Sequence, residues 1–353
     1  MHLLDELQSD GLKSWLLQHN EPLYRAAQVQ SWLLEKRVEN FEQMTNLSKS
    51  LREHLTDAFV IWQTKVATSL TATDGTEKLL LELVDGHRIE CVLLRDEDRR
   101  TICISTQVGC AMGCVFCASG LGGVERNLTT GEIVEQMLRL QRLLPVDERL
   151  SHIVVMGMGE PLANIDRLLP ALELASDAHG LGISPRRITI STVGLPAGMD
   201  KLSHRAARFH LAVSLHAPND ELRTELVPVN TSIGIDKIIA AADRYFEASG
   251  RRLTFEYVLL SGVNDQPEHA HGLVSRLQGR QAMLNVIPYN PVDGLPYKTP
   301  SPNALRRFRE ILETGGLNVM VRQRKGDKIN AACGQLRRNA ASVPNVIQPT
   351  LPR

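Results

Sequence analysis

Residues 103–120 read CISTQVGCAMGCVFCASG and hold three cysteines, Cys110, Cys114 and Cys117, with the spacing Cys-x3-Cys-x2-Cys. Three neighbouring thiols do not make a disulfide framework, because one is always left over. A structural zinc site takes four protein ligands, whereas a cubane iron–sulfur cluster held by three cysteines keeps one iron open to a substrate. The loop therefore predicts a reactive cluster. The alternatives are zinc with a distant fourth ligand, or three unrelated buried cysteines.

The composition indicates a cytoplasmic enzyme. The chain has 353 residues, 43% of them hydrophobic, enough for one large domain or for a large and a small one. The sequence shows no transmembrane run, and its start, MHLLDELQSDGLK, is acidic and mixed, unlike a signal peptide. Six cysteines suit a reducing compartment. Forty basic and 40 acidic residues cancel, which argues against coating of nucleic acid through bulk charge but leaves room for a local basic patch.

Downstream of residue 100, short apolar runs alternate with stretches of helical periodicity. Strands are expected over 101–105, 152–156, 187–191, 209–215, 253–259 and 283–287, and helices over 129–144, 165–178, 235–249, 268–277 and 301–314. Thr129 and Glu132 match a capping box. Six βα units imply an α/β fold with parallel strands in an open, curved barrel. The loops that follow the strands carry the chemistry of such barrels.

The rest of the chain predicts three further parts. Residues 1–62 show helical spacing over 12–18, 25–37 and 46–58 and are expected to form a helical accessory domain, which either contacts RNA or simply caps the next domain. Residues 63–99 are expected to form a β-hairpin extension with its turn at Asp85-Gly86. The barrel is expected over 100–340, and the proline-rich residues 341–353 are expected to be a flexible tail.

Seven motifs, in this order, resemble the RlmN/Cfr family of radical S-adenosylmethionine RNA adenine methyltransferases, and RlmN most. They are CISTQVGCAMGCVFCASG, VVMGMGEPL, ITISTVG, AVSLHAPND, FEYVLLSGVND, IPYNP and GDKINAACGQLR. The resemblance runs from about Leu23 to about Arg338. It implies a partial (open) βα barrel of the radical S-adenosylmethionine type, with an N-terminal helical domain and a β-hairpin extension. It also implies two cofactors, a [4Fe-4S] cluster and S-adenosylmethionine.

The resemblance assigns the cofactor site residue by residue. Cys110, Cys114 and Cys117 would hold three irons, and S-adenosylmethionine would bind the fourth. Gly159 and Glu160 would receive the ammonium group of the methionine moiety, for which a carboxylate is a suitable partner. The other implied positions are Ser191, Ser214, the backbone of Leu215, His216 and Asn290. Taken singly, a strand-end serine is more often a helix cap than a ligand, so the ordered set carries the assignment.

The resemblance also implies a mechanism that uses two cysteines. Cys333 would take a methyl group from a first S-adenosylmethionine, since a thiolate is a good nucleophile. A radical made from a second one would remove hydrogen from that methyl group, and the methylene radical would add to adenine. Cys103 would then release the methylated RNA by forming a disulfide with Cys333, which external reduction reopens. Without the resemblance, Cys103 reads as a buried strand cysteine.

Glu90, in the second strand of the hairpin, matches the proton acceptor of the family. A strand carboxylate is ordinarily just solvated, so only the resemblance supports this role. Strand alternation places Cys91 on the opposite face, where a small packed thiol is the simpler expectation.

RNA is expected to meet a basic segment near Cys333 through phosphate contacts, although a solvated charge run fits equally well. This segment contains Arg322, Arg324, Lys325, Lys328, Arg337 and Arg338. Aromatic residues make up only 4% of the chain, so no stacking platform is visible and the target base is expected to leave its stack.

The predicted function is methylation of adenine C2 in 23S ribosomal RNA at the peptidyl-transferase centre, extending to transfer RNA. The alternative within the family is Cfr-type C8 methylation, which confers antibiotic resistance. An electron donor such as flavodoxin, a monomeric state and no membrane partner are expected. Two other classes stay open. A radical enzyme for a protein or small molecule would not need Cys103 and Cys333, and a zinc-bearing RNA-binding module would not cleave S-adenosylmethionine.

Overall fold

The computed structural model describes residues 1–7, 9–322, 325–326 and 329–337. Its strands are β1 Lys65–Thr71, β2 Glu77–Glu82, β3 Arg88–Arg95, β4 Arg100–Cys103, β5 Gln107–Gly109, β6 Val124–Asn127, β7 His152–Val155, β8 Ile188–Thr192, β9 His210–Ser214, β10 Leu253–Leu259, β11 Ala282–Pro288 and β12 Asn318–Val321. Ten of them form one sheet in the order β1-β2-β3-β4-β7-β8-β9-β10-β11-β12, and β5 pairs with β6 in a separate hairpin.

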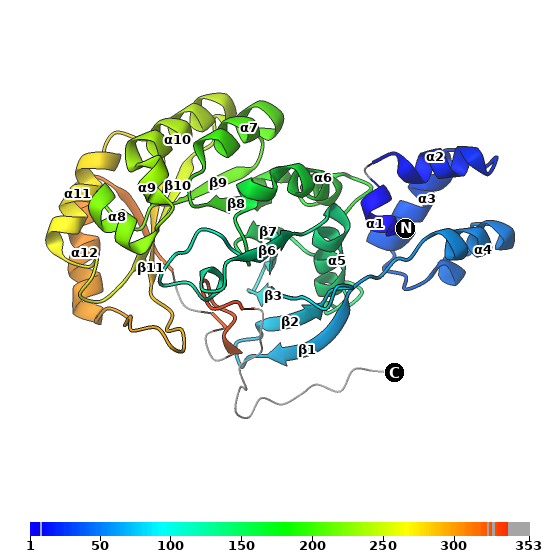
Figure 1. Cartoon of the computed structure of the whole chain (residues 1–353), viewed down its shortest axis with the longest axis horizontal. Coiled ribbons are helices and arrows are strands. Elements are labelled where there is room, and N and C mark those ends of the chain that lie inside the picture. The colour runs from blue at the N-terminus through cyan, green and yellow to red at the C-terminus, as the bar shows by residue number, and fades with distance from the viewer. Residues whose placement is uncertain (8, 323–324, 327–328, 338–353) are drawn as a thin grey trace.

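The large sheet combines an antiparallel and a parallel part. From β1 to β4 the neighbours run antiparallel, and from β4 to β12 they run parallel. In the described residues β1 and β12 are the end strands of the order, so the curved sheet stays open (Figure 1). The predicted open βα barrel is confirmed, and the hairpin extension continues the same sheet through the pairing of β3 with β4.

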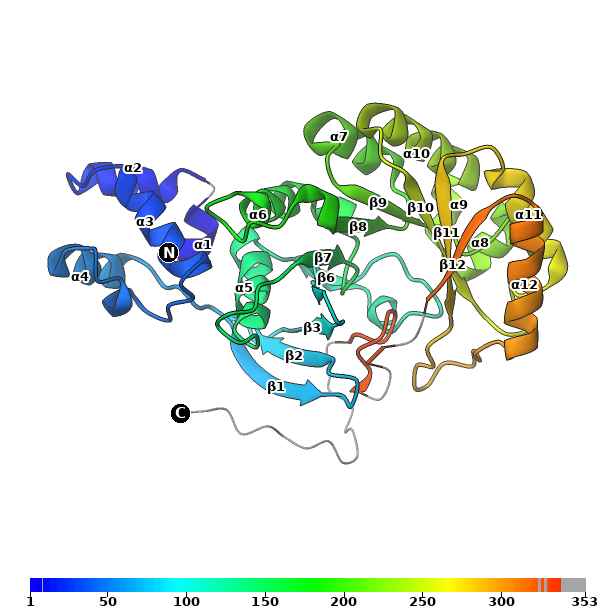
Figure 2. The same ribbon diagram turned by 180° about the vertical axis from the view of Figure 1, so that it is seen from behind.

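The helices belong either to the N-terminal domain or to the outer side of the parallel strands. They are α1 Leu3–Glu6, α2 Gly11–Gln18, α3 Tyr24–Leu34, α4 Lys49–Ala58, α5 Thr130–Gln141, α6 Ile165–Ser176, α7 Pro196–Ala206, α8 Asp220–Leu226, α9 Asn230–Ile233, α10 Ile235–Ser249, α11 Pro267–Leu277 and α12 Pro302–Thr314. The N-terminal domain contains α1 to α4, and α5 to α12 lie on the outer side of the parallel strands. Single 3-10 turns are η1 Phe41–Gln43, η2 Ala118–Gly120, η3 Pro161–Asn164 and η4 Pro185–Arg187. Figure 2 shows α2 to α4 at one end of the molecule and α10 to α12 at the other.

The alternation of strand residues separates core from cavity. Ile153 of β7 is buried in the core under the helices, and Val154 after it lines a cavity on the inner side. The predicted capping box is present at the start of α5, where Glu132 N–H donates to Thr129 Oγ1 and Thr129 N–H donates to Glu132 Oε2. Nearly all of α5 is buried, because it packs against α1 as well as α6.

The six predicted barrel strands and five predicted helices are all found, with ends shifted by at most three residues. The sequence patterns did not predict α7, α8, α9, β12 or the β5–β6 hairpin. Most of these elements are short, so they contain too few residues to show a clear periodicity of apolar positions. The hairpin turn at Asp85-Gly86 is confirmed: Gly86 has φ +81°, and Leu83 N–H donates to His87 O over 2.8 Å.

The expected N-terminal helices are present, and their buried residues belong to one hydrophobic core that is continuous with the barrel. Leu12, Leu16 and Leu55 are fully buried in that core. His2 reaches Glu135 of α5, with Nε2 and Oε2 3.5 Å apart. No helix among the described residues is long and apolar enough to cross a membrane. The tail predicted over 341–353 lies outside the described residues, as do Arg324, Lys328 and Arg338.

Candidate active site

The three-cysteine loop is a compact turn between β5 and β6. Cys110 N–H donates to Gly123 O over 2.9 Å, and Cys117 N–H donates to Cys114 O over 3.1 Å. Gly113 has φ +68°, a conformation that a side chain disfavours. All three cysteines are free, half-buried and line one cavity. Burial raises the pKa of each thiol, that of Cys110 to about 12, so the thiols are neutral until a metal displaces their protons.

The donor set fits a cluster better than a single ion. Among the described residues, no three His, Cys, Asp or Glu side chains converge as ligands of one metal ion would. A zinc site therefore lacks its ligand set here. A cubane takes each cysteine at a different iron, so it needs three thiols facing one space rather than one point. Cys110, Cys114 and Cys117 meet that requirement.

This cofactor cavity, of about 150 Å³, lies at the carboxyl ends of the parallel strands. Besides the three cysteines, its wall contains most of the predicted positions, namely Gly159, Glu160, Ser191, Ser214, His216, Asn290 and Cys333. They follow or end β7, β8, β9 and β11, with Cys333 in the segment after β12. Parallel strands bring their carboxyl ends to one edge of a sheet, so residues far apart in sequence meet there.

Glu160 is buried and held by three protein donors. Its Oε1 accepts from Thr192 Oγ1 over 2.7 Å and from Leu162 N–H over 3.0 Å, and its Oε2 accepts from Val193 N–H over 2.8 Å. Burial outweighs these bonds and raises the pKa of the carboxyl. A carboxylate offers about four acceptor positions, so one remains for a ligand in the cavity.

Gly159 is required by a close approach of two chain segments. It has φ +105°, and a Cβ there would lie 2.7 Å from Gln107 Cβ. Gln107 Oε1 in turn accepts from Glu160 N–H over 2.8 Å. The Gly-Glu pair is therefore fixed against the strand that leads into the cysteine loop, which orients Glu160.

His216 is a neutral side chain with one nitrogen directed by the backbone. Burial, with a smaller contribution from Arg223, lowers its pKa to about 3. Its Nδ1 accepts from Val258 N–H over 3.1 Å, so we assign the hydrogen to Nε2. The residue has φ +62° and its ring meets Phe116 of the cysteine loop edge-on, with ring centres 5.0 Å apart. Such a strained residue in a cavity wall is typical of a functional site.

Leu215, also among the predicted positions, does not line the cofactor cavity. Leu215 is fully buried, its N–H donates to Glu256 O, and its carbonyl accepts from Arg223 Nε over 3.0 Å. Arg223 is itself fully buried and also binds the carbonyls of Val193 and Ser214. It thereby joins the ends of β8 and β9 behind the cofactor cavity. Nothing in the sequence pattern singled out Arg223, because its partners are backbone atoms.

A second cavity, of about 640 Å³, adjoins the first along the inner side of the sheet. Four residues line both cavities: Met156, Ile287, Asn290 and Cys333. Asn290 Nδ2 donates to Cys333 O over 3.2 Å, while its buried Oδ1 has no partner among the described residues. Cys333 therefore lies at the junction of the two spaces, beside a free acceptor.

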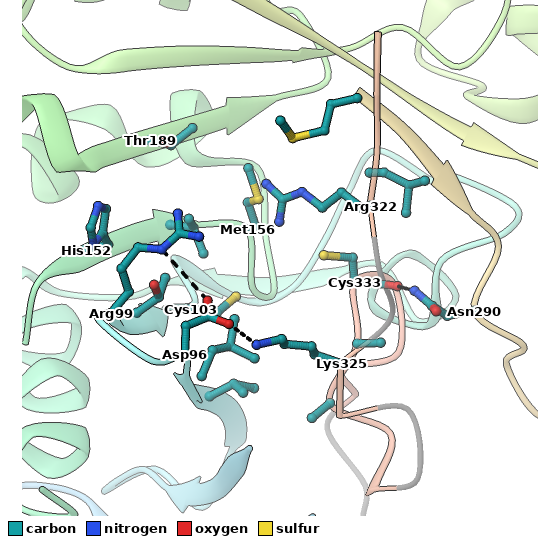
Figure 3. Close-up of a pocket in the computed structure, with 18 of the residues that line it drawn as sticks. Asp96, Arg99, Cys103, His152, Met156, Thr189, Asn290, Arg322, Lys325 and Cys333 are labelled. Carbon is teal, nitrogen blue, oxygen red and sulfur yellow. Dashed lines mark hydrogen bonds and ion pairs between the residues drawn. The ribbon is translucent and has the colours of Figure 1, made fainter. Parts of the chain in front are cut away.

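Cys103 and Cys333 come from opposite walls of this second cavity. Figure 3 shows Cys103 on β4 and Cys333 on the segment after β12, both facing the space between them. Cys103 is buried and Cys333 is exposed. Burial, together with the nearby Cys333, raises the pKa of Cys103 to about 12, and Arg322 opposes the shift. The two thiols that the sequence singled out thus share one cavity.

Glu90 occupies a different place. Its carboxylate is buried rather than solvated, with Oε1 2.7 Å from Lys78 Nζ and Oε2 accepting from Arg337 N–H over 2.8 Å. It is not among the residues that line either cavity. Burial outweighs Lys78 and raises the pKa of the carboxyl. Cys91 beside it is fully buried, as expected for a packed free thiol.

Comparison with known proteins covers nearly the whole chain. The profile of the Radical SAM superfamily matches residues 104–274, and that of the ribosomal RNA large subunit methyltransferase N-terminal domain matches residues 1–61. A protein of Rhodopirellula baltica named "Probable dual-specificity RNA methyltransferase RlmN" is 64% identical over 95% of this chain and 90% of its own. A protein of the same name from Bacillus subtilis is 45% identical over 93% and 91%.

One solved structure matches the fold closely. The crystal structure of a radical SAM methyltransferase from Sphaerobacter thermophilus superimposes with a TM-score of 0.92 at 41% identity, covering 96% of this chain and all of the other. The resemblance stated from the motifs is therefore confirmed over the helical domain, the hairpin and the barrel.

Proposed function

The chain belongs to the RlmN family of radical S-adenosylmethionine RNA methyltransferases, and from this premise we propose that it methylates C2 of an adenine in RNA. The proposed substrate is 23S ribosomal RNA at the peptidyl-transferase centre, with transfer RNA as a second substrate. The dual specificity in the names of its relatives supports two kinds of RNA.

The position of Cys333 is the observation that carries the proposal. It lines the cavity of the cluster cysteines and also the cavity that contains Cys103. A methyl group on its sulfur could be reached from the cofactor side and presented to a base on the other. A radical enzyme for a small molecule would have no need of a second thiol facing this one.

Cys110, Cys114 and Cys117 would hold the cluster, and Glu160, Ser191, Ser214, His216 and Asn290 would orient S-adenosylmethionine. When bound, this pair of cofactors supplies a methyl group and a radical able to remove hydrogen from an S-methyl group. Glu160 has one acceptor position left for the methionine ammonium group. His216 Nε2–H would donate a hydrogen bond, since the ring stays neutral.

Cys333 would carry the methyl carbon to the base, and Cys103 would resolve the protein–RNA adduct. A disulfide between them forms as the methylated RNA leaves, and two electrons from an external reductant reopen it. We keep Glu90 as a candidate proton acceptor, which requires its carboxylate to leave the ion pair with Lys78. We also propose that a flavodoxin-type protein donates the electrons and that the enzyme is a monomer.

Mass spectrometry of nucleosides tests this function. RNA from cells that lack the gene should lose 2-methyladenosine, and a plasmid-borne copy should restore it. Equal 2-methyladenosine in both strains would refute the proposal. Appearance of 8-methyladenosine with the gene would instead assign the Cfr-type reaction. Separate digestion of 23S and transfer RNA determines which of them is a substrate.

A further inference from the structure

The second cavity changes its character along the strands. Strand register places Cys103 beside Val154 and Val154 beside Thr189, and places Thr101 beside His152. Cys103, Val154 and Thr189 thus form one row across the strands, and Thr101 and His152 form a second, polar row. The polar row lies two residues, or about 7 Å, closer to the amino ends of the strands.

The wall of this second cavity is also cationic. Five basic side chains line the cavity, and among its described lining residues Asp96 is the only carboxylate. The five are Arg99, Arg186, Arg187, Arg322 and Lys325. Asp96 forms ion pairs with Lys325 and Arg99 (Figure 3). In the second pair, Arg99 Nε and Asp96 Oδ2 are 4.0 Å apart. The side chains of Arg186, Arg187 and Arg322 have no ion-pair partner in the described part of the chain.

This excess of charge is local. The whole chain carries 40 basic and 40 acidic residues. On the outer helices, Arg205 pairs with Asp166 and Arg244 pairs with Asp200, whereas Arg307 makes no ion pair among the described residues. An arginine without an ion pair is therefore not in itself a sign of a ligand. What distinguishes the cavity is that five basic side chains line one space with a single described carboxylate, and this excess of positive charge favours an anionic partner.

We propose that Arg186, Arg187 and Arg322 bind phosphates of the RNA that flank the target nucleotide, while its base reaches Cys103 and Cys333. This inference rests on the proposed function and assigns the RNA-facing surface of that site. Guanidinium groups suit phosphate because they donate two parallel hydrogen bonds. A volume of about 640 Å³ is in the usual range for a bound small molecule, roughly 300–1,000 Å³, and so admits an extruded nucleotide but not a duplex.

Two of these residues lie outside the basic segment that the sequence indicated. Arg186 and Arg187 belong to η4, directly before β8, whereas Arg322 follows β12. Phosphates would thus be held from both edges of the opening. Thr101 and His152 line the same cavity and offer hydrogen-bonding groups for a ribose.

The salt dependence of RNA binding tests the proposal. A fluorescent 23S RNA fragment spanning the peptidyl-transferase centre is titrated with the full-length protein at several salt concentrations. The logarithm of the binding constant falls with the logarithm of the salt concentration, and each lost phosphate contact makes this slope less steep by about 0.7 for single strands. Replacing Arg186→Ala and Arg187→Ala together should lower it by about 1.4 and weaken binding roughly 20-fold at 0.1 M salt.

A matched variant removes the same charge elsewhere. Arg306 and Arg307 are exposed on α12, outside both cavities, so Arg306→Ala with Arg307→Ala should leave the slope unchanged. Lysine at positions 186 and 187 should restore most of the slope. An unchanged slope in the first variant, or an equal loss in the matched variant, would overturn the inference. Failure of the proposed function is distinguishable, because wild-type protein would then form no methyladenosine whatever its RNA affinity.

Discussion

Lys78 Nζ lies 2.7 Å from Glu90 Oε1, and this ion pair is buried between the hairpin strands and the segment that carries Cys333. Lys78 also donates to Asn330 O, and Glu90 accepts from Arg337 N–H. The pair therefore holds the chain on both sides of Cys333. Glu90, with a proposed chemical role in RNA methylation, is thus in this structure part of the contacts that hold the segment of Cys333, the cysteine proposed to carry the methyl group.

Replacing Lys78→Met should destabilise the protein by about 3–5 kcal/mol, because it leaves a buried carboxylate without its partner. Chemical denaturation measures this loss. The variant also lacks a group that lowers the pKa of Glu90, which burial already raises. A raised folded-state pKa costs stability above that pKa, so the deficit should shrink as pH falls and the carboxyl is protonated.

Lys49, exposed on α4, supplies the control, since Lys49→Met removes a cation that makes only an exposed pair with Glu53. Hydrogen exchange should also quicken around residues 329–337 in the Lys78 variant alone. Unaltered stability together with unaltered exchange would show that the pair does not hold the Cys333 segment.

Replacing Glu160 should weaken binding of S-adenosylmethionine without affecting binding of the iron–sulfur cluster. With Glu160→Gln, iron content after anaerobic reconstitution should stay near wild type, because the residue is not a thiol ligand. S-adenosylmethionine should bind about ten- to a hundred-fold more weakly, the loss expected for one charge-assisted hydrogen bond of about 1.5–3 kcal/mol. Thr192→Val removes only one donor to the carboxylate and should cost less. Calorimetry showing wild-type affinity in Glu160→Gln would refute the role.

The sequence predicted the barrel because a buried parallel strand appears in sequence as a run of apolar residues. The cysteine spacing alone singled out the loop whose three thiols line one cavity. The ordered motifs assigned Ser191, Ser214 and His216 to one site, and in the structure all three line one cavity. Local patterns do not contain pairings across the sheet. The burial of Glu90 depends on Lys78 in the neighbouring strand, and Arg223 binds carbonyls of two other strand ends. Such partners follow only from the tertiary structure.

The contact between the N-terminal helices and the barrel should depend on pH through His2. Burial lowers the pKa of His2, but hydrogen bonds to Asp5 and Glu135 outweigh it and raise the pKa to about 9. A raised histidine pKa stabilises the folded state fully below its unfolded value of about 6.5, and this stabilisation is lost as pH rises through about 9. The difference is about 3 kcal/mol.

Urea denaturation between pH 6 and pH 10 measures this change. Wild-type stability should fall across that window relative to His2→Gln, which lacks the titrating group. Parallel pH profiles for the two proteins would show that His2 does not titrate as described.

The two thiols of the second cavity should fail differently when replaced, because their proposed tasks differ. Cys333→Ala removes the methyl carrier, so its peptides should contain no S-methylcysteine and no RNA should become attached. Cys103→Ala keeps the carrier and lacks the resolving thiol. It should stall as a covalent protein–RNA adduct, visible on a denaturing gel and removed by nuclease. Cys91→Ala changes a fully buried cysteine outside both cavities and should give neither defect. Normal turnover in both Cys103→Ala and Cys333→Ala would remove the chemical basis for RNA methylation at this site.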